Sequence, residues 1–293
     1  MYALLLGGLC IGFAPLLVRL ADTGPVASAF WRLAIAAPLL WLLWWRAERA
    51  AKPSAIRGAS ADVPAWRSPA LWSSGLFFSA DLAVWHFSLG YTTVANATLL
   101  ANCAPLLVTL YALLIQRRAP PRLFFLALLL ALGGAFLLVS PNFSPGSRQL
   151  RGDALALLAC VFYSGYMLAV KRASERHATL RLMAVSTTLS ALLLLPVAWW
   201  LSRQHGQAFW PSSAGGWWVV VALALITQVT GQGLIAWALA RLSVPLSSTG
   251  LLIQPVVAAA TAWLLFGESL RAAQLAGALV LLLGIYLARR SQA

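Results

Sequence analysis

The chain has 293 residues, of which 61% are hydrophobic and only 10% are charged, and its mean hydropathy is +0.82. Soluble domains are about 45–50% apolar and about 25% charged, so this composition excludes an ordinary soluble fold and is typical of a membrane protein. The net charge of +14 does not indicate a nucleic-acid partner, because the basic residues lie in short loops between apolar runs. We therefore expect the lipid bilayer to surround the chain.

Ten apolar segments follow one another, each about 18–25 residues long, which is enough to cross a ~30 Å hydrocarbon core as a helix. The first segment has no positively charged start and no cleavage site, which indicates a spanning helix rather than a signal peptide. The fold class is therefore an all-α polytopic membrane protein. We predict spans at residues 2–20, 25–45, 69–90, 93–116, 121–140, 152–171, 179–201, 215–240, 245–266 and 272–288.

The distribution of basic residues predicts the orientation of the chain. An even number of spans places both termini on the same side of the membrane. Of the 21 Lys and Arg residues, 15 lie on that side, five lie on the other, and Arg32 lies within a span. Basic residues favour cytoplasmic loops, so we expect both termini to be cytoplasmic.

An internal repeat relates the two halves of the chain. Residues 89–139 align with 239–289 at an offset of 150, so that Pro105 meets Pro255 and a short loop follows each proline-containing helix. This alignment predicts two five-helix repeats, residues 1–140 and 141–293. Because five is odd, the second repeat is inverted, an arrangement typical of secondary transporters that expose a central cavity to alternate sides.

The repeated segments also carry a family resemblance. The runs NATLLANCAPLLVTLYALL and SSTGLLIQPVVAAATAWLLF, the FGE turn at 266–268 and the run QLAGALVLLLGIYLA resemble the EamA-type exporters of the drug/metabolite transporter superfamily. In the first repeat, residues 116–118 read QRR where that family usually has a Gly-Glu pair. The long loop at 46–68 and the abundant Trp are most similar to YddG-like amino acid exporters of bacterial inner membranes. The resemblance implies export of amino acids, including aromatic ones, and of some toxic compounds.

Two opposite charges are predicted deep inside spans, Asp81 and Arg32, and each costs about 2.5–3.5 kcal/mol at the bilayer centre unless compensated. Both lie roughly 10–14 Å below the same membrane face, so we expect them to compensate each other. Trp85 follows Asp81 by one helical turn, and the two side chains could bind an ammonium group by charge and cation–π attraction. The alternative is that Asp81 only pairs with Arg32 or with backbone.

His86 lies in the same span, about 140° around the helix from Asp81, so the two are not predicted to form a dyad. Proton coupling through His86 or Asp81 is one hypothesis, and an interfacial histidine without such a role is the alternative.

Uncharged polar and aromatic side chains form a second set of candidates for lining the cavity. Helices interrupted by proline are tolerated where they face a cavity, and polar side chains near them either contact substrate or bond to neighbouring helices. The candidates are Asn102, Gln254, Gln228, Gln232, Tyr163, Tyr166 and Trp237.

Several motifs are missing from the sequence. It contains no GxxxxGK[ST], HExxH or GxSxG, and its three cysteines show no metal-ligand spacing. We therefore predict no enzyme activity, no cofactor and no metal. The predicted function is export of amino acids or related small molecules by a monomeric secondary transporter, with a membrane enzyme acting on a lipid-linked substrate, or a passive channel, as alternatives.

Overall fold

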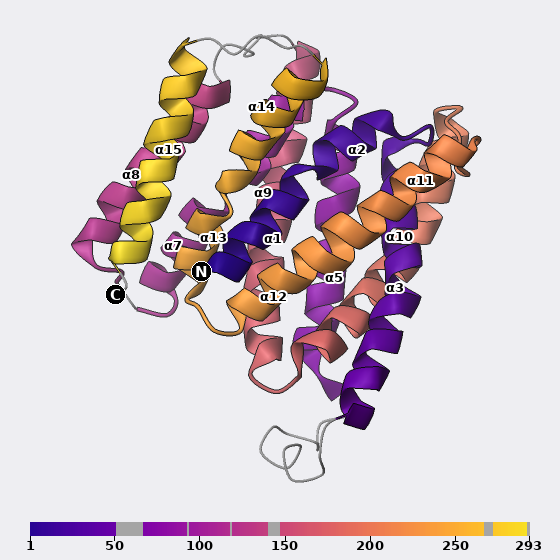
Figure 1. Cartoon of the computed structure of the whole chain (residues 1–293), viewed down its shortest axis with the longest axis horizontal. Coiled ribbons are helices and arrows are strands. Elements are labelled where there is room, and N and C mark those ends of the chain that lie inside the picture. Colours follow the sequence, from indigo (N-terminus) through magenta and orange to yellow (C-terminus); the bar gives the residue numbers. More distant parts are fainter. Residues whose placement is uncertain (51–66, 93, 118, 140–146, 267–271, 292–293) are drawn as a thin grey trace.

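The computed structural model describes residues 1–50, 67–92, 94–117, 119–139, 147–266 and 272–291. These residues form helices that coincide with the ten predicted spans, and no strand occurs among them, which confirms the predicted all-α fold (Figure 1). The elements are α1 (Tyr2–Gly12), α2 (Ala14–Leu20), α3 (Pro25–Ala50), α5 (Pro69–Ser88), α6 (Val94–Ala101), α7 (Ala104–Leu114), α8 (Arg122–Val139), α9 (Ser147–Ser174), α10 (Thr179–Gln204), α11 (Ala214–Ala222), η3 (Leu223–Gln232), α12 (Gly233–Leu239), α13 (Val244–Gly250), α14 (Ile253–Phe266) and α15 (Ala272–Arg290).

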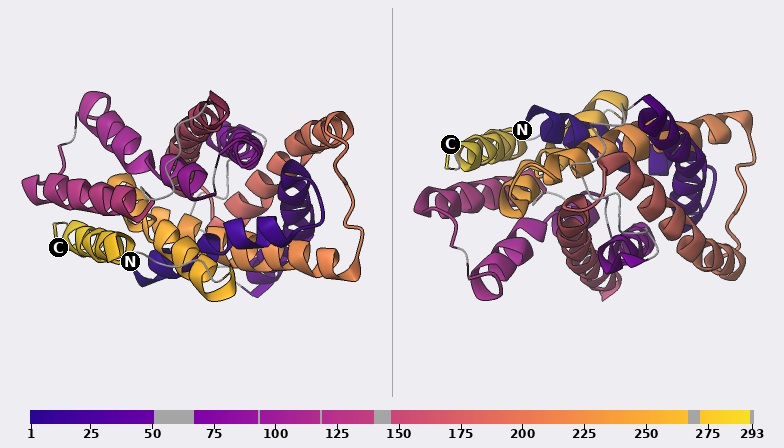
Figure 2. Two further views of the ribbon diagram at one scale, coloured as in Figure 1. Left: turned by 90° about the horizontal axis from the view of Figure 1, so that it is seen from above. Right: turned by 90° about the horizontal axis from the view of Figure 1, so that it is seen from below.

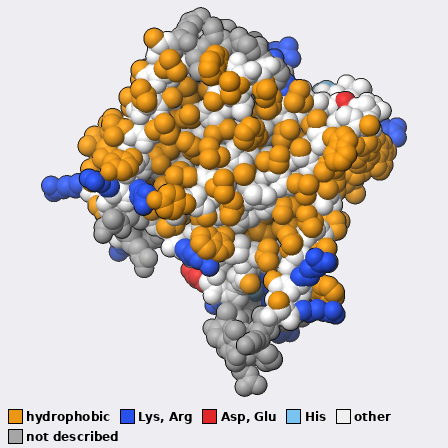
Figure 3. Space-filling model, viewed as in Figure 1, with side chains coloured by type: hydrophobic (Ala, Val, Ile, Leu, Met, Phe, Trp, Pro, Cys, Tyr) orange, Lys and Arg blue, Asp and Glu red, His pale blue; other side chains and the backbone are white. Residues whose placement is uncertain are grey.

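Most of these helices have the length and hydropathy needed to cross a bilayer. Eight helical stretches in the described residues meet both requirements, and α8 is slightly shorter. The 20 residues of α5 span about 30 Å, but the helix is less apolar because it carries Asp81, His86 and several serines. Figure 3 shows hydrophobic side chains over the middle of one face and Lys and Arg at its borders, as a bilayer requires.

Three predicted spans are interrupted. Phe13 separates α1 from α2, residues 102–103 separate α6 from α7, and residues 251–252 separate α13 from α14. The last two breaks correspond at the repeat offset to within one residue, and each lies just before an aligned proline, Pro105 or Pro255. The sequence predicted these three spans as continuous helices, but proline cannot donate the backbone bond that an unbroken helix needs.

The contacts between helices repeat in the two halves. α5 packs on α9, and its counterpart, formed by η3 and α12, packs on α1; likewise α7 contacts α9, while α14, which corresponds to α7 at the repeat offset, contacts α1. α3 packs on its own counterpart α10, and α7 packs on α13 while their counterparts α14 and α6 pack on each other. Each contact recurs when both helices are replaced by their equivalents in the other repeat, which is the pattern of two inverted five-helix repeats.

α8 and α15 lie side by side at one edge of the molecule in both views of Figure 2. Their backbones touch because glycines meet at the interface: a Cβ atom on Gly134 would collide with Leu281 N and Gly277 O. Gly134 of α8 and Gly284 of α15 stand at the repeat offset of 150, and both lie at this interface, where small residues let two backbones approach closely.

Both termini lie toward the same end of the molecule, as an even number of crossings requires (Figure 1). The predicted repeat boundary at 140–141 and most of the FGE turn at 266–268 fall outside the described residues.

Candidate functional site

A central cavity of about 70 Å³ lies where the interrupted helices meet α3, α5, α9 and η3. Its wall combines two opposite charges, amides and aromatic rings. The lining residues are Ile11, Gly12, Ala14, Pro15, Arg32, Phe78, Asp81, Leu82, Trp85, Thr98, Ala101, Asn102, Tyr163, Gln232 and Gln254.

α5 places Asp81 and Trp85 on the same wall of this cavity, one helical turn apart. Asp81 is buried, and its carboxylate has no hydrogen-bond partner among the described residues. A buried carboxylate without a partner is costly unless a ligand or water completes it. As the sequence predicts, Asp81 and Trp85 share one face of α5.

Arg32 reaches the cavity from α3 and is 3% exposed. Its Nε donates a hydrogen bond to Gln228 Oε1 at 3.1 Å, and its guanidinium carbon lies 6.0 Å from the centre of the Phe78 ring. Arg32 and Asp81 interact electrostatically, yet no ion pair joins them in the described structure. The cavity thus presents a cation and an anion that are not tied directly to each other.

The segment η3 is a π-helix, and it carries both glutamines of this region. Gln228 Nε2 donates to Thr187 Oγ1 at 3.0 Å, and Gln232 Nε2 donates to Tyr166 Oη at 3.0 Å. Gln228 and Tyr166 are buried behind the cavity wall, so they support the lining residues rather than line the cavity themselves. A π-helical turn within a helix is frequent at functional sites, and no sequence signal predicted it here.

The interrupted helices contribute amide and hydroxyl groups. Asn102 Nδ2 donates to Thr98 O at 2.8 Å, which leaves the Asn102 amide oxygen free to face the cavity. Gln254 Nε2 and Thr98 Oγ1 are buried and have no hydrogen-bond partner in the described residues. Thr98 was not predicted from the sequence, although its position one turn before Asn102 could have indicated it, and Phe78 was not predicted either.

His86 does not face the central cavity. Its ring lies at an angle of 87° to the Trp85 ring, 4.8 Å away, and lines a separate pocket nearer the end opposite the termini. Asp81 and His86 therefore open onto different spaces, as their spacing on one helix predicts.

The prediction that Trp237 lines the cavity needs correction. Its side chain is 43% exposed on the outside of α12, where the Arg241 guanidinium lies 3.8 Å from the centre of the indole ring. Apolar residues at every position around a spanning helix hide which side faces lipid, because lipid is as apolar as the protein interior.

Metal-binding side chains are not gathered anywhere in the part of the chain that the structure describes: no group of three or more His, Cys, Asp or Glu could hold an ion. The three cysteines are free thiols, at positions 10, 103 and 160.

Comparison with known proteins agrees with this architecture. The pseudopaline exporter CntI of Pseudomonas aeruginosa is 25% identical over 260 residues, covering 88% of this chain and 84% of that protein. The threonine/homoserine exporter RhtA of Escherichia coli is 27% identical over 207 residues, covering 68% and 65%. A solved crystal structure, 18% identical, superposes with a TM-score of 0.73 over 98% of this chain and 96% of its own, and shows the same fold.

The EamA-like transporter family matches the chain twice, at residues 1–140 and 150–290, and so covers nearly its whole length. Family members are transporters rather than enzymes, which agrees with the polar groups found around a central cavity. The chain belongs to the EamA-like transporter family.

Proposed function

We propose that this protein exports amino acids, including aromatic ones, and related small metabolites from the bacterial cytoplasm by alternating access. It acts as a monomer in the inner membrane with both termini in the cytoplasm. The excess of Lys and Arg on the side of the termini supports this orientation.

The observation that carries the proposal is the pair of unjoined charges in the central cavity. An amino acid zwitterion carries one cation and one anion a few ångströms apart. Asp81 can accept its ammonium group and Arg32 can bind its carboxylate, because both line the cavity without an ion pair between them. A bound zwitterion thereby gives each of the two side chains an opposite charge. An isolated buried charge is costly unless it is paired in this way.

The remaining cavity wall suits the rest of such a molecule. Trp85, Phe78 and Tyr163 offer aromatic surface to a side chain, and the indole of Trp85 also favours a cation beside Asp81. α7 begins just after Asn102, and Gln254 lies in the first turn of α14. The N-termini of these half-helices carry positive dipole ends that favour a carboxylate.

Two further pockets support movement of solute through the protein. One of about 510 Å³ lies at the end opposite the termini, and one of about 380 Å³ lies at the end of the termini, beside Lys171 and Arg172. The cavity between them is far smaller than the roughly 300–1,000 Å³ of pockets that enclose a drug-sized ligand. Helices must therefore separate to load it, as alternating access requires.

The names of the relatives support export of small metabolites, since one is a threonine/homoserine exporter and another a pseudopaline exporter. Sequence identities of 25–27% are too low to assign a relative's substrate to this chain unless the binding site supports the assignment. The aromatic wall is the feature that favours aromatic amino acids here.

The test is counterflow in proteoliposomes loaded with unlabelled amino acid and supplied outside with labelled L-tryptophan or L-threonine, with and without a pH gradient. We expect saturable exchange, and at least about a tenfold loss in Asp81→Asn, since a charge-assisted contact is removed. Asp153→Asn, which changes an acid that accepts a bond from Thr92 Oγ1 outside the cavity, should retain exchange. Linear, non-saturable flux without counterflow identifies a passive channel and overturns the proposal.

A further inference from the structure

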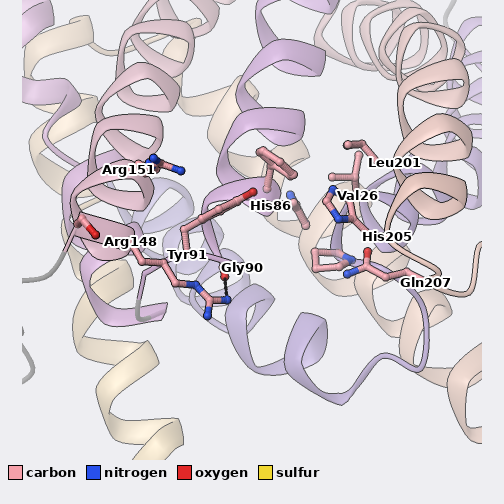
Figure 4. Close-up of a pocket in the computed structure, with 12 residues that line it drawn as sticks. Val26, His86, Gly90, Tyr91, Arg148, Arg151, Leu201, His205 and Gln207 are labelled. Carbon is pink, nitrogen blue, oxygen red and sulfur yellow. Dashed lines mark hydrogen bonds between the residues drawn. The ribbon is translucent and has the colours of Figure 1, made fainter.

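The pocket of about 510 Å³ at the end opposite the termini is separate from the central cavity and has its own chemistry (Figure 4). It lies between the start of α3, the end of α5, the start of α9 and the end of α10. The lining residues are Pro25, Val26, His86, Phe87, Gly90, Tyr91, Ser147, Arg148, Arg151, Leu201, His205 and Gln207.

The charge of this outer pocket is one-sided. Arg148 and Arg151 both line it from the first turns of α9, and none of its lining residues is Asp or Glu. Arg148 donates to Gly90 O at 2.9 Å, while Arg151 makes no side-chain hydrogen bond to any other described residue. The nearby carboxylate of Asp153 already accepts a hydrogen bond at its Oδ1 from Thr92 Oγ1, at 2.6 Å. The pocket therefore offers guanidinium donors to an anion and no competing carboxylate.

His86 supplies a second, independent sign of a ligand. The side chain is fully buried, its Nδ1 lies 2.8 Å from Leu82 O, and its Nε2 is buried without a partner. A carbonyl oxygen only accepts, so Nδ1 carries the proton of the neutral ring and Nε2 is an acceptor. His86 lines the pocket, so an N–H or O–H group of a molecule in the pocket can supply the donor that this buried acceptor lacks.

The rest of the wall is apolar. Pro25, Val26, Phe87 and Leu201 form it, and Figure 4 shows Tyr91 reaching across the pocket between the arginines of α9 and His86. Its volume falls within the range of about 300–1,000 Å³ that accommodates small-molecule ligands.

We propose that this outer pocket is a second solute site, in which Arg148 and Arg151 bind the carboxylate of the exported molecule and His86 Nε2 accepts a hydrogen bond from it. The solute is a carboxylate with an apolar body and an N–H or O–H group. This inference rests on the proposed export of amino acids and places a release site beyond the central cavity. Because His86 and Asp81 lie on the same helix, one solute can pass from one site to the other along α5.

The experiment measures equilibrium binding of labelled L-tryptophan to the full chain in lipid nanodiscs, in wild-type and Asp81→Asn backgrounds. The Asp81→Asn background weakens the central cavity and leaves the outer pocket intact. Indolepropionate, which keeps the carboxylate, should compete, and tryptamine, which lacks it, should not. Arg151→Gln should weaken binding about tenfold, the effect of losing one charge-assisted bond.

The matched control is Arg203→Gln. Arg203 lies in the last turn of α10 near the same end, and its guanidinium is 4.8 Å from the centre of the Trp199 ring, outside the pocket. Arg203→Gln removes the same charge as Arg151→Gln but outside the pocket, so it should leave the binding of L-tryptophan unchanged. His86→Asn keeps a donor near Leu82 O but removes the Nε2 acceptor, and it should also weaken binding.

Three results overturn the inference: no binding of L-tryptophan, equal competition by tryptamine, or an unchanged affinity in Arg151→Gln. Displacement of L-tryptophan by anionic phosphatidylglycerol in the nanodisc, dependent on Arg151, assigns the pocket to a lipid headgroup and also overturns it. Failure of this inference can be distinguished from failure of the proposed function. Normal counterflow in Arg151→Gln contradicts only the outer site, whereas absent counterflow in the wild type contradicts the export of amino acids.

Discussion

The hydrogen bond from Arg32 Nε to Gln228 Oε1 joins α3 to the π-helical η3 in the middle of the bundle. It holds a buried cation at the cavity wall without neutralising it, because the acceptor is an uncharged amide. The position of the guanidinium therefore depends on a residue that does not itself line the cavity.

Gln228→Leu should lower the free energy of unfolding by about 1.5–3 kcal/mol, since it removes a hydrogen bond to a charged group and leaves that group buried. Thermal unfolding of the detergent-purified protein measures the change. Thr187→Val is the control: it removes only the neutral bond from Gln228 Nε2 to Thr187 Oγ1, and should cost about 0.5–1.5 kcal/mol. Equal losses in both variants contradict the importance of the charge.

Asp81 and Arg32 should be energetically coupled even though no ion pair joins them in the described structure. Asp81→Asn or Arg32→Gln alone leaves one buried charge without its opposite, so each single change should reduce expression and stability more than the double change does. A double-mutant cycle on thermal unfolding measures the coupling, which we expect to exceed about 0.5 kcal/mol. Effects that simply add contradict compensation between the two charges.

Neighbouring glycines of α8 offer a matched test of how α8 and α15 pack. Gly134→Ala should destabilise the protein by about 1–3 kcal/mol, because its Cβ meets Leu281 and Gly277 backbone atoms that cannot move independently. Gly133→Ala adds the same methyl group where no atom lies within 4 Å. It should be neutral, or stabilising by up to about 1 kcal/mol, since alanine is the better helix former. Similar melting temperatures for the two variants contradict the close contact.

Asp22 should make stability depend on acid pH. The Ser212 hydroxyl, the Ser213 hydroxyl and both backbone N–H groups donate to Asp22 Oδ2 at 2.8–3.0 Å, and they hold the pKa of this carboxyl below its ordinary value. The stabilisation is present above the unfolded pKa of about 3.9 and is lost as pH falls through the lower folded value.

Asp22→Asn, which does not titrate, should therefore lose less stability than the wild type between neutral pH and about pH 3. Thermal unfolding across that range measures it. Ser212→Ala removes one donor and should give an intermediate pH dependence. An identical acid response in the wild type and Asp22→Asn assigns the acid sensitivity to other groups.

Much of the architecture could be predicted from the sequence, because spans are dictated by length and hydropathy. The placement of Asp81 and Trp85 on one wall followed from their spacing of four residues, a local property of any helix. Arg32 could be matched to them because both depths count from the same membrane face. These predictions required no knowledge of which helices touch.

The features that escaped prediction depend on neighbours distant in the chain. Whether Trp237 faces lipid or cavity is decided by what packs on α12, and its own segment is apolar on all sides. The π-helical turns of η3 carry the hydrogen bonds of Gln228 to α3 and α10. Arg148 and Arg151 were expected in a loop, but α9 begins at Ser147 and turns them toward the outer pocket.

The contact of Gly134 with Gly277 has a mechanical consequence. Two helices whose backbones touch cannot slide past each other by part of a turn without collision, because no flexible side chain separates them. α8 and α15, the last helices of the two repeats, therefore behave as one rigid unit. In the alternating access that we propose, the remaining helices accommodate the opening of the central cavity, above all at the three interruptions, where shorter turn hydrogen bonds replace the regular helical ones.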